Sequence, residues 1–153
     1  MSSPYKDNFG KPVGHPVENW TGCKLPPRSD MTGQHVIVSP VNVARDARQL
    51  FDANSAAADG SRFTYLWTHA FDDFDAYRAW LEGMVANSDP ILHAIIDKST
   101  NMAVGVAAFM RIDAANGVIE VGNINYAPAL SKTIGGTEAM YLMMKRAFDE
   151  LGY

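Results

Sequence analysis

The segment from Ser131 to Thr137 (SKTIGGT) carries the residue types that bind an anion. It follows a β-type run that ends at Tyr126, and it opens a helical run with two glycines, Gly135 and Gly136, in the first turn. The first N–H groups of a helix have no internal partner, and the helix dipole places about half a positive charge there. The segment therefore predicts a phosphate-type site, since glycine also lets a ligand approach the backbone. The side chains expected to add contacts are those of Ser131, Lys132, Thr133 and Thr137.

The alternative is a strand-to-helix turn that needs glycine only for its backbone angles. The segment matches neither the Walker pattern nor the dinucleotide-binding Gly-x-Gly-x-x-Gly pattern. Both interpretations stay open on spacing alone.

A second polar group lies in the run VIEVGNINY (118–126). Glu120 is its only carboxylate, and Asn123 and Asn125 place amides where strand propensity is unfavourable. They indicate either a site or a solvated strand face. Gly122 is the expected position of a β-bulge.

Several elements must position these residues. Strands are predicted at 35–41, 91–97, 103–112 and 118–126, with hairpin loops at 98–102 and at Asn116-Gly117, the strongest short-range hairpin signal in the chain. The centre is therefore an antiparallel meander. Residues 53–62 are expected to be a loop, and 63–67 (FTYLW) a strand fragment or a packed loop.

Three helices complete the prediction. Asn42 is expected to cap the first, Asp72 or Asp73 opens the second, which runs to about Val85, and the third follows Pro128. Gly152 is expected to cap the third helix at its C-terminal end. The apolar face of this helix is expected to comprise Met140, Met143, Met144, Ala147, Phe148 and Leu151.

Composition limits the function classes. A chain of 153 residues with 47% hydrophobic and 20% charged residues is typical of one globular domain, here 35–153, preceded by a Pro/Gly-rich extended arm, 1–34. The net charge of −4 argues against a nucleic-acid binder. No apolar run approaches the roughly 20 residues that span a membrane, and the histidines have no metal spacing. The single Cys23 and the absence of a signal-type segment predict a cytoplasmic protein.

The strand VIEVGNINY, the loop PALSKTIGGTEA and the helix ending in FDELGY together resemble the GNAT superfamily of N-acetyltransferases, in its RimJ/RimL-type branch. The arm from Gly14 to Trp20 and the segment FTYLW…FDDFDAYRAWLEGM share the resemblance. It implies an α+β, three-layer fold with a mainly antiparallel central sheet and helices on both faces. It also implies acetyl-CoA as co-substrate, no metal, and acetyl transfer to a primary amine, either a protein N-terminus or a small amine. The alternative is a non-catalytic acyl-CoA-binding or interaction module.

The resemblance also assigns residues. The family's pyrophosphate loop aligns with Lys132–Thr137 or Thr133–Glu138, although its first position, Gln or Arg in the family, is Lys or Thr here. The implied acetyl-CoA contacts are Ile124, Asn125, Tyr126, Lys132, Thr133, Ile134, Gly135, Gly136 and Thr137.

The remaining assignments concern catalysis and the acceptor. Backbone N–H groups around Asn125 would hold the oxyanion, and Glu120 would be the base, directly or through water. The alternative for Glu120 is a strand carboxylate that faces solvent or a cross-strand cation. Tyr65, Trp67 and Phe71 would line the acceptor groove, or else belong to an aromatic core.

Family members continue beyond the point matching Leu151-Gly152-Tyr153 with further strands and a helix. We therefore expect a chain that stops before its C-terminal third and lacks the C-terminal strands and the general acid. The strand 118–126 would then have a free edge, which predicts a homodimer or an exchange of elements between two copies.

Overall fold

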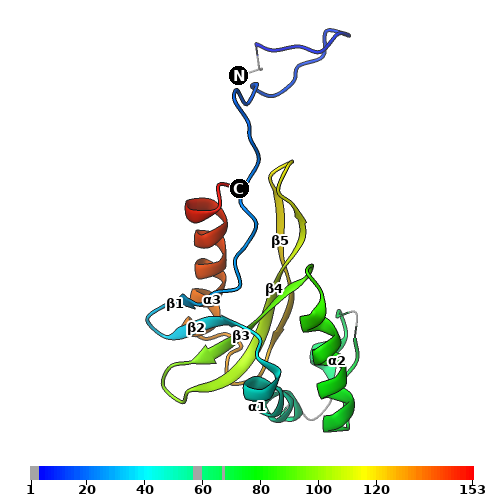
Figure 1. Ribbon diagram of the computed structural model, residues 1–153, viewed down its shortest axis with the longest axis vertical. Coiled ribbons are helices and arrows are strands. Elements are labelled where there is room, and N and C mark those ends of the chain that lie inside the picture. Colours follow the sequence, from blue (N-terminus) through cyan, green and yellow to red (C-terminus); the bar gives the residue numbers. More distant parts are fainter. Residues whose placement is uncertain (1–3, 57–59, 67) are drawn as a thin grey trace.

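A computed structural model describes residues 4–56, 60–66 and 68–153 (Figure 1). Its elements, in chain order, are β1 (Met31–Thr32), β2 (Val36–Pro40), α1 (Val43–Ser55), η1 (Ser61–Phe63), α2 (Phe74–Ala86), β3 (Ile91–Asp97), β4 (Met102–Asp113), β5 (Val118–Tyr126), α3 (Ile134–Lys145) and η2 (Arg146–Glu150). None of the helices in these ranges is long and apolar enough to cross a membrane.

The strands form one five-stranded sheet in the order β1-β2-β3-β4-β5, and every neighbouring pair is antiparallel. The predicted meander is confirmed, and β3 and β5 have the predicted bounds. The short strand β1 was not predicted, because two residues carry no periodic signal. It is defined only by its pairing with β2, where Met31 faces Val38.

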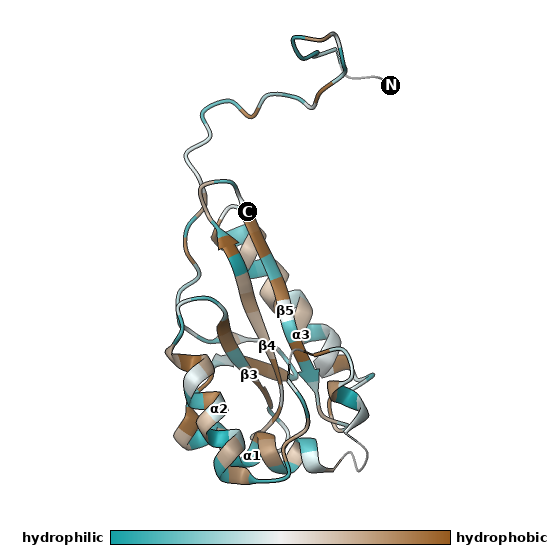
Figure 2. Ribbon diagram, turned by 90° about the vertical axis from the view of Figure 1, so that its right-hand side faces the viewer, coloured by the Kyte–Doolittle hydropathy of each residue, from teal (hydrophilic) through white to brown (hydrophobic). Residues whose placement is uncertain are grey.

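Helices cover both faces of the sheet, which confirms the predicted α+β architecture. On one face, Leu50 of α1 and Leu81 of α2 pack with Leu92 of β3 in one buried cluster. On the other face, Met143 of α3 packs with Ile95 of β3. Figure 2 shows the apolar strands β3 and β4 between these two layers. The chain therefore has a separate core on each side of the sheet, and the site residues of β5 lie at one end of the strand order.

Helix starts follow the predicted capping chemistry. The Asn42 side chain accepts from the N–H of Arg45, and the Asp73 side chain accepts from that of Ala76. Because α1 runs to Ser55, the first part of the expected loop 53–62 is helical instead. Of the expected 63–67 segment, the described residues form the end of a 3₁₀ turn and a loop rather than a strand.

The last helix buries a narrower stripe than predicted. Met143, Ala147 and Leu151 are buried, whereas Met144 and Phe148 are 48% and 64% exposed. Residues 144 and 148 lie about 100° around the axis from that stripe. The helix also widens into a π-type turn over η2. Gly152 follows with a left-handed φ of 84°, as predicted for a C-terminal glycine.

The arm has two parts. Residues 4–19 extend away from the body in Figure 1. Residues 20–30 dock between the β4–β5 turn and η2, where the Trp20 indole donates to Ala115 O at 2.6 Å and the Lys24 N–H donates to Leu151 O at 2.9 Å. Arg146, only 7% exposed, donates to the carbonyls of Ser29 and Asp30 at 2.7 and 2.8 Å.

Candidate acyl-transfer site

The bulge predicted near Gly122 is present in β5. The register moves from Val106 opposite Asn125 to Ala108 opposite Gly122, so two residues, Asn123 and Ile124, face one residue of β4. Asn123 has a left-handed φ of 49°. The bulge places the side chains of both Asn123 and Asn125 on the α2 side of the sheet, where they line one cavity.

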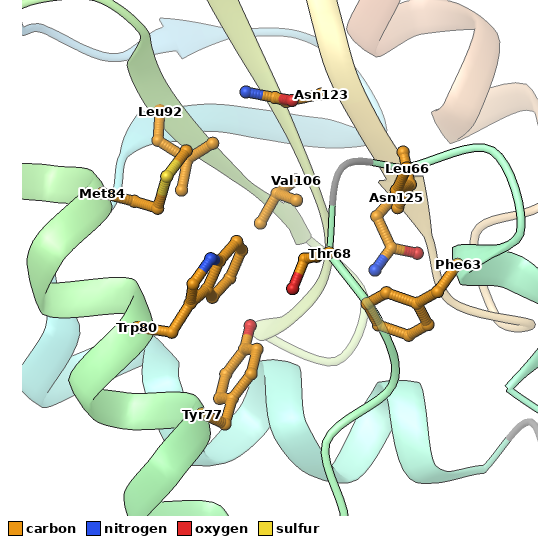
Figure 3. Close-up of a pocket in the computed structure, with 10 residues that line it drawn as sticks. All are labelled: Phe63, Leu66, Thr68, Tyr77, Trp80, Met84, Leu92, Val106, Asn123 and Asn125. Carbon is orange, nitrogen blue, oxygen red and sulfur yellow. The ribbon is translucent and has the colours of Figure 1, made fainter.

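This cavity has a volume of about 220 Å³. Figure 3 shows Tyr77, Trp80 and Met84 of α2 reaching toward β5 across it. Its described lining residues are otherwise mostly apolar and include no charged side chain; they are Phe63, Leu66, Thr68, Tyr77, Trp80, Met84, Leu92, Val106, Asn123 and Asn125. Burial raises the pKa of Tyr77, and the nearby Asp46 carboxylate adds to this effect, so the phenol stays protonated.

The next residue of β5, Tyr126, faces a second hollow on the α3 side. Its ring lines that hollow with several predicted cofactor residues: Lys132, Thr133, Gly136 and Thr137. The Tyr126 hydroxyl donates to Gly136 O at 3.0 Å, and burial raises its pKa to about 12. Consecutive residues of one strand, Asn125 and Tyr126, thus connect the cavity to the helix start.

The start of α3 has some backbone N–H groups with partners among the described residues and some without. Thr133 is the N-cap, and its hydroxyl accepts from the N–H of Gly136 at 3.1 Å. The Thr137 N–H donates to Thr133 O at 3.3 Å. Within the described residues, Ile134 and Gly135 have no such partner for their N–H groups, which therefore remain the available donors at this end of the helix dipole.

The two glycines of the loop also have a packing reason. A Cβ at Gly136 would lie 2.9 Å from the carbonyl oxygen of Leu130, and one at Gly135 would lie 2.9 Å from Val36 Cγ1. The alternative interpretation, glycine for close packing, therefore accounts for both residue types without a ligand. The two available N–H donors are a feature of every helix start and do not decide between the interpretations.

Glu120 lies apart from both hollows. Its carboxylate pairs with Arg111 at 3.1 Å, and the two side chains are 43% and 68% exposed. The remaining predicted residues are also scattered: Tyr65 is 97% exposed, Ile124 is 41% exposed and Phe71 packs against Tyr77 and Trp80. Trp67 lies outside the described residues.

Two features of the site were not predicted. Arg62, which looks like an ordinary surface charge in the sequence, donates to the main-chain carbonyl of Tyr126 and so fastens the η1 turn to the end of β5. Leu92 and Val106 line the cavity from β3 and β4, far from the loop that the sequence pointed to. No group of three or more potential metal ligands occurs in residues 4–56, 60–66 and 68–153.

Solved structures resemble the chain over most of its length. A GCN5-related N-acetyltransferase from Brucella melitensis is 37% identical, with a TM-score of 0.87 over 90% of this chain and 62% of that protein. A probable acetyltransferase of the GNAT family from Chromobacterium violaceum is 32% identical, with a TM-score of 0.83 over 93% of this chain and 70% of that protein. The chain belongs to the GNAT family. The family prediction made from the β5–α3 unit is thereby confirmed.

This GNAT chain spans 62% and 70% of the lengths of those two proteins. An acetyltransferase of the GNAT family from Bacillus anthracis, at 16% identity and a TM-score of 0.64, shares the fold. No protein-family model and no curated protein matches the sequence of this chain.

Proposed function

We propose that the protein transfers an acetyl group from acetyl-CoA to a primary amine. The observation that carries this proposal is the arrangement around β5: a helix start with two available N–H groups on one side of Tyr126, and a cavity whose described lining residues carry no charge on the other side, at Asn125. A pyrophosphate at Ile134 and Gly135 and an amine in the cavity would meet at the bulge between them. The acceptor is either a protein N-terminus or a small amine.

The free Cys23 is consistent with the cytoplasm as the compartment of this protein.

In the proposed reaction the amine nitrogen attacks the thioester carbon, the new N–C bond forms and the C–S bond breaks. The N–H groups around Asn125 would hold the oxyanion, and the proton lost by the amine would reach the leaving thiolate. Glu120 remains our proposed base. Because it is three residues from Asn123, or about 10 Å along a strand, it would act through a chain of waters.

Glu120 is tested by paired substitutions. We expect Glu120→Gln to lower kcat by about 10²-fold or more, and Arg111→Gln to leave kcat within about threefold. An equal loss in both variants would instead assign the pair a structural role. Unchanged turnover in Glu120→Gln would remove Glu120 from the mechanism.

Binding and turnover are measured separately. Thermal shift with CoA reports occupancy of the α3 site, and release of free thiol from acetyl-CoA in the presence of amines reports transfer. Stabilisation by CoA without amine-dependent thiol release would favour the alternative, a non-catalytic acyl-CoA-binding module. This alternative is supported by the position of Glu120 outside the cavity. No stabilisation by CoA would contradict both functions.

We also propose a homodimer through the free side of β5. Val118 and Ile124 on this strand are 50% and 41% exposed, and Tyr141 and Met144 of α3 are 57% and 48% exposed. The two α3 residues also line the Tyr126 hollow. A second copy and CoA would therefore compete, so light scattering should show dimers at high protein concentration that dissociate when CoA is added. Monomers at all concentrations would contradict the dimer.

A further inference from the structure

The cavity between α2 and β5 has properties that acetyl transfer alone does not require. For acetyl transfer alone, any primary amine that reaches the acetyl group of acetyl-CoA at the bulge would be sufficient. This cavity instead extends from Asn123 and Asn125 past Val106 to Trp80 and Met84, and it is enclosed by apolar and aromatic groups (Figure 3). Its shape and chemistry therefore bear on which amine is accepted.

The size of the cavity sets the size of its occupant. An apolar cavity of about 150 Å³ is sufficient to hold benzene. The present cavity, at about 220 Å³, accommodates one ring or a branched aliphatic group with a short polar substituent. A bare ammonium or a methyl group would leave most of its apolar lining without contacts.

The electrostatics of the cavity exclude a polycation. Among the described residues that line it, none has a carboxylate to pair with a second ammonium group, and their polar atoms belong to neutral hydroxyl, amide and indole groups. Burying an unpaired charge in such surroundings is strongly unfavourable. The part of the ligand inside the cavity is therefore neutral.

One buried group indicates a hydrogen bond with the ligand. The Asn125 side chain is 7% exposed and lines the cavity, and within the described residues neither of its two polar atoms has a hydrogen-bond partner. Its Oδ1 is enclosed by protein, whereas its Nδ2 points toward the cavity in Figure 3 and is the atom placed to donate to a ligand carbonyl. Buried polar groups without partners are rare, and a ligand in the cavity would supply the partner for Nδ2.

We propose that this cavity selects acceptors whose primary amine carries an aromatic or branched apolar group and an adjacent amide. The apolar group lies against Trp80, Met84 and Val106, and the amide is paired with Asn125. This proposal rests on the proposed function only for the amine's role as acceptor, since binding in the cavity is independent of transfer.

Two sources share this chemistry: a free aromatic amine and the first residue of a polypeptide. Phenylalaninamide represents the common core. Phenethylamine lacks the amide, alaninamide lacks the ring, and a short peptide that begins with Phe extends the amide into a chain. Tighter binding of the peptide than of phenylalaninamide identifies a polypeptide acceptor, and weaker binding identifies a small amine.

Calorimetric titration of the whole chain with these four probes, with and without CoA, tests the proposal. We expect phenylalaninamide to bind at least about 30-fold more tightly than alaninamide, because the ring buries far more apolar area than a methyl group. Equal affinity of the two would overturn the proposal. If the expected order holds but no probe is acetylated, the cavity is assigned correctly and the proposed function fails.

Two variants locate the binding. Thr68→Phe fills the cavity from the loop, and we expect at least a tenfold loss of phenylalaninamide affinity. Thr64→Phe, in the same loop but exposed and outside the lining, is the matched control and should bind normally. Normal binding by Thr68→Phe would place the ligand elsewhere and overturn the proposal.

The amide contact is tested by a ratio. Asn125→Leu should lower the affinity for phenylalaninamide about tenfold and the affinity for phenethylamine less than threefold, because only phenylalaninamide pairs with Asn125. A folding defect would weaken both ligands equally. An unchanged ratio of the two affinities would contradict the Asn125 contact.

Discussion

At the scale of single residues, Ile134 offers the sharpest test of the anion site. It is the first residue of α3, and the preceding Thr133 is extended, with φ −108° and ψ 166°. A proline at this position keeps a helix intact and removes only the N–H donor. Substitution of Gly136 would test packing instead, because its added Cβ meets the Leu130 carbonyl.

We therefore expect Ile134→Pro to lower the affinity for CoA about tenfold, which is the loss typical of one hydrogen bond to a charged group. Its Tm should be unchanged. Ile134→Ala, which retains the N–H, should bind CoA normally. Isothermal titration with CoA measures both variants. If both variants bind equally, the Ile134 N–H does not contact the ligand.

His93 predicts a pH dependence of stability. It is fully buried beside the edge of Phe109, its Nδ1 lies 3.0 Å from Ile91 O, and its Nε2 is enclosed without a partner in the described residues. Desolvation lowers its pKa to about 4, against a smaller opposing effect of the Ile91 hydrogen bond. Charged groups act on it as well: Arg146 and Arg28 lower the pKa further, and Asp30 raises it.

The unfolded chain, with a His pKa near 6.5, binds a proton before the folded chain does as pH falls. Stability should therefore decrease from about pH 6.5 to about pH 4, by about 3 kcal/mol. His93→Leu should flatten this part of the curve in urea titrations over that pH range. A variant with the same slope as the parent would assign the dependence to other groups.

At the scale of elements, Glu138 joins α3 to the turn between β1 and β2. Its carboxylate accepts from the N–H groups of Gln34, His35 and Val36 at 2.7, 2.7 and 2.9 Å. Partial burial raises the pKa of Glu138, but the three donors outweigh it and hold the pKa below its ordinary value. This lowered pKa stabilises the fold above the unfolded pKa near 4.5, and the stabilisation is lost as pH falls through the folded value.

Glu138→Gln should cost about 1–2 kcal/mol of unfolding free energy at neutral pH, since the amide accepts fewer and weaker bonds. Glu82→Gln is the control, because Glu82 is in an exposed helical pair with Arg78 and should cost less than about 0.5 kcal/mol. Urea unfolding at pH 7 compares them. Equal costs would mean that the three N–H contacts of Glu138 add nothing beyond a surface pair.

Elements with local signals could be predicted from the sequence. The bounds of β3 and β5, the caps Asn42 and Asp73, and the bulge at Gly122 follow from periodicity and turn chemistry. Several residues that line the Tyr126 hollow, such as Lys132 and Thr137, belong to the one continuous segment that the sequence singled out. The Asn125 cavity was not predicted, because Thr68, Leu92 and Val106 come together only through tertiary packing. The Arg62 contact with Tyr126 joins residues 64 positions apart and leaves no local pattern.

At the scale of the whole molecule, the arm and η2 stabilise each other. The buried Arg146 guanidinium makes two main-chain contacts with residues 29 and 30 and one ion pair, with Glu150 at 3.2 Å. Removal of a buried, hydrogen-bonded cation leaves carbonyl groups without partners.

Arg146→Met should therefore lower the unfolding free energy by about 2–4 kcal/mol and expose residues 20–30 to protease. Limited proteolysis with N-terminal sequencing of the fragments measures the second effect. Arg78→Met, an exposed position on α2, is the control. A variant whose arm is cleaved no faster than that of the parent would show that Arg146 does not hold it.

The docked part of the arm also sets an order of events during synthesis. The Cys23 thiol donates to the carbonyl of Gly152, 129 positions later in the chain, and Lys24 is bound to Leu151 and Glu150. At about 5–20 residues per second, a ribosome needs on the order of ten seconds to make that stretch. Residues 20–30 lack their partners in residues 146–152 throughout this interval, while β3 and β4 can already pair. Residues 20–30, made long before η2, are thus among the last to reach their final position.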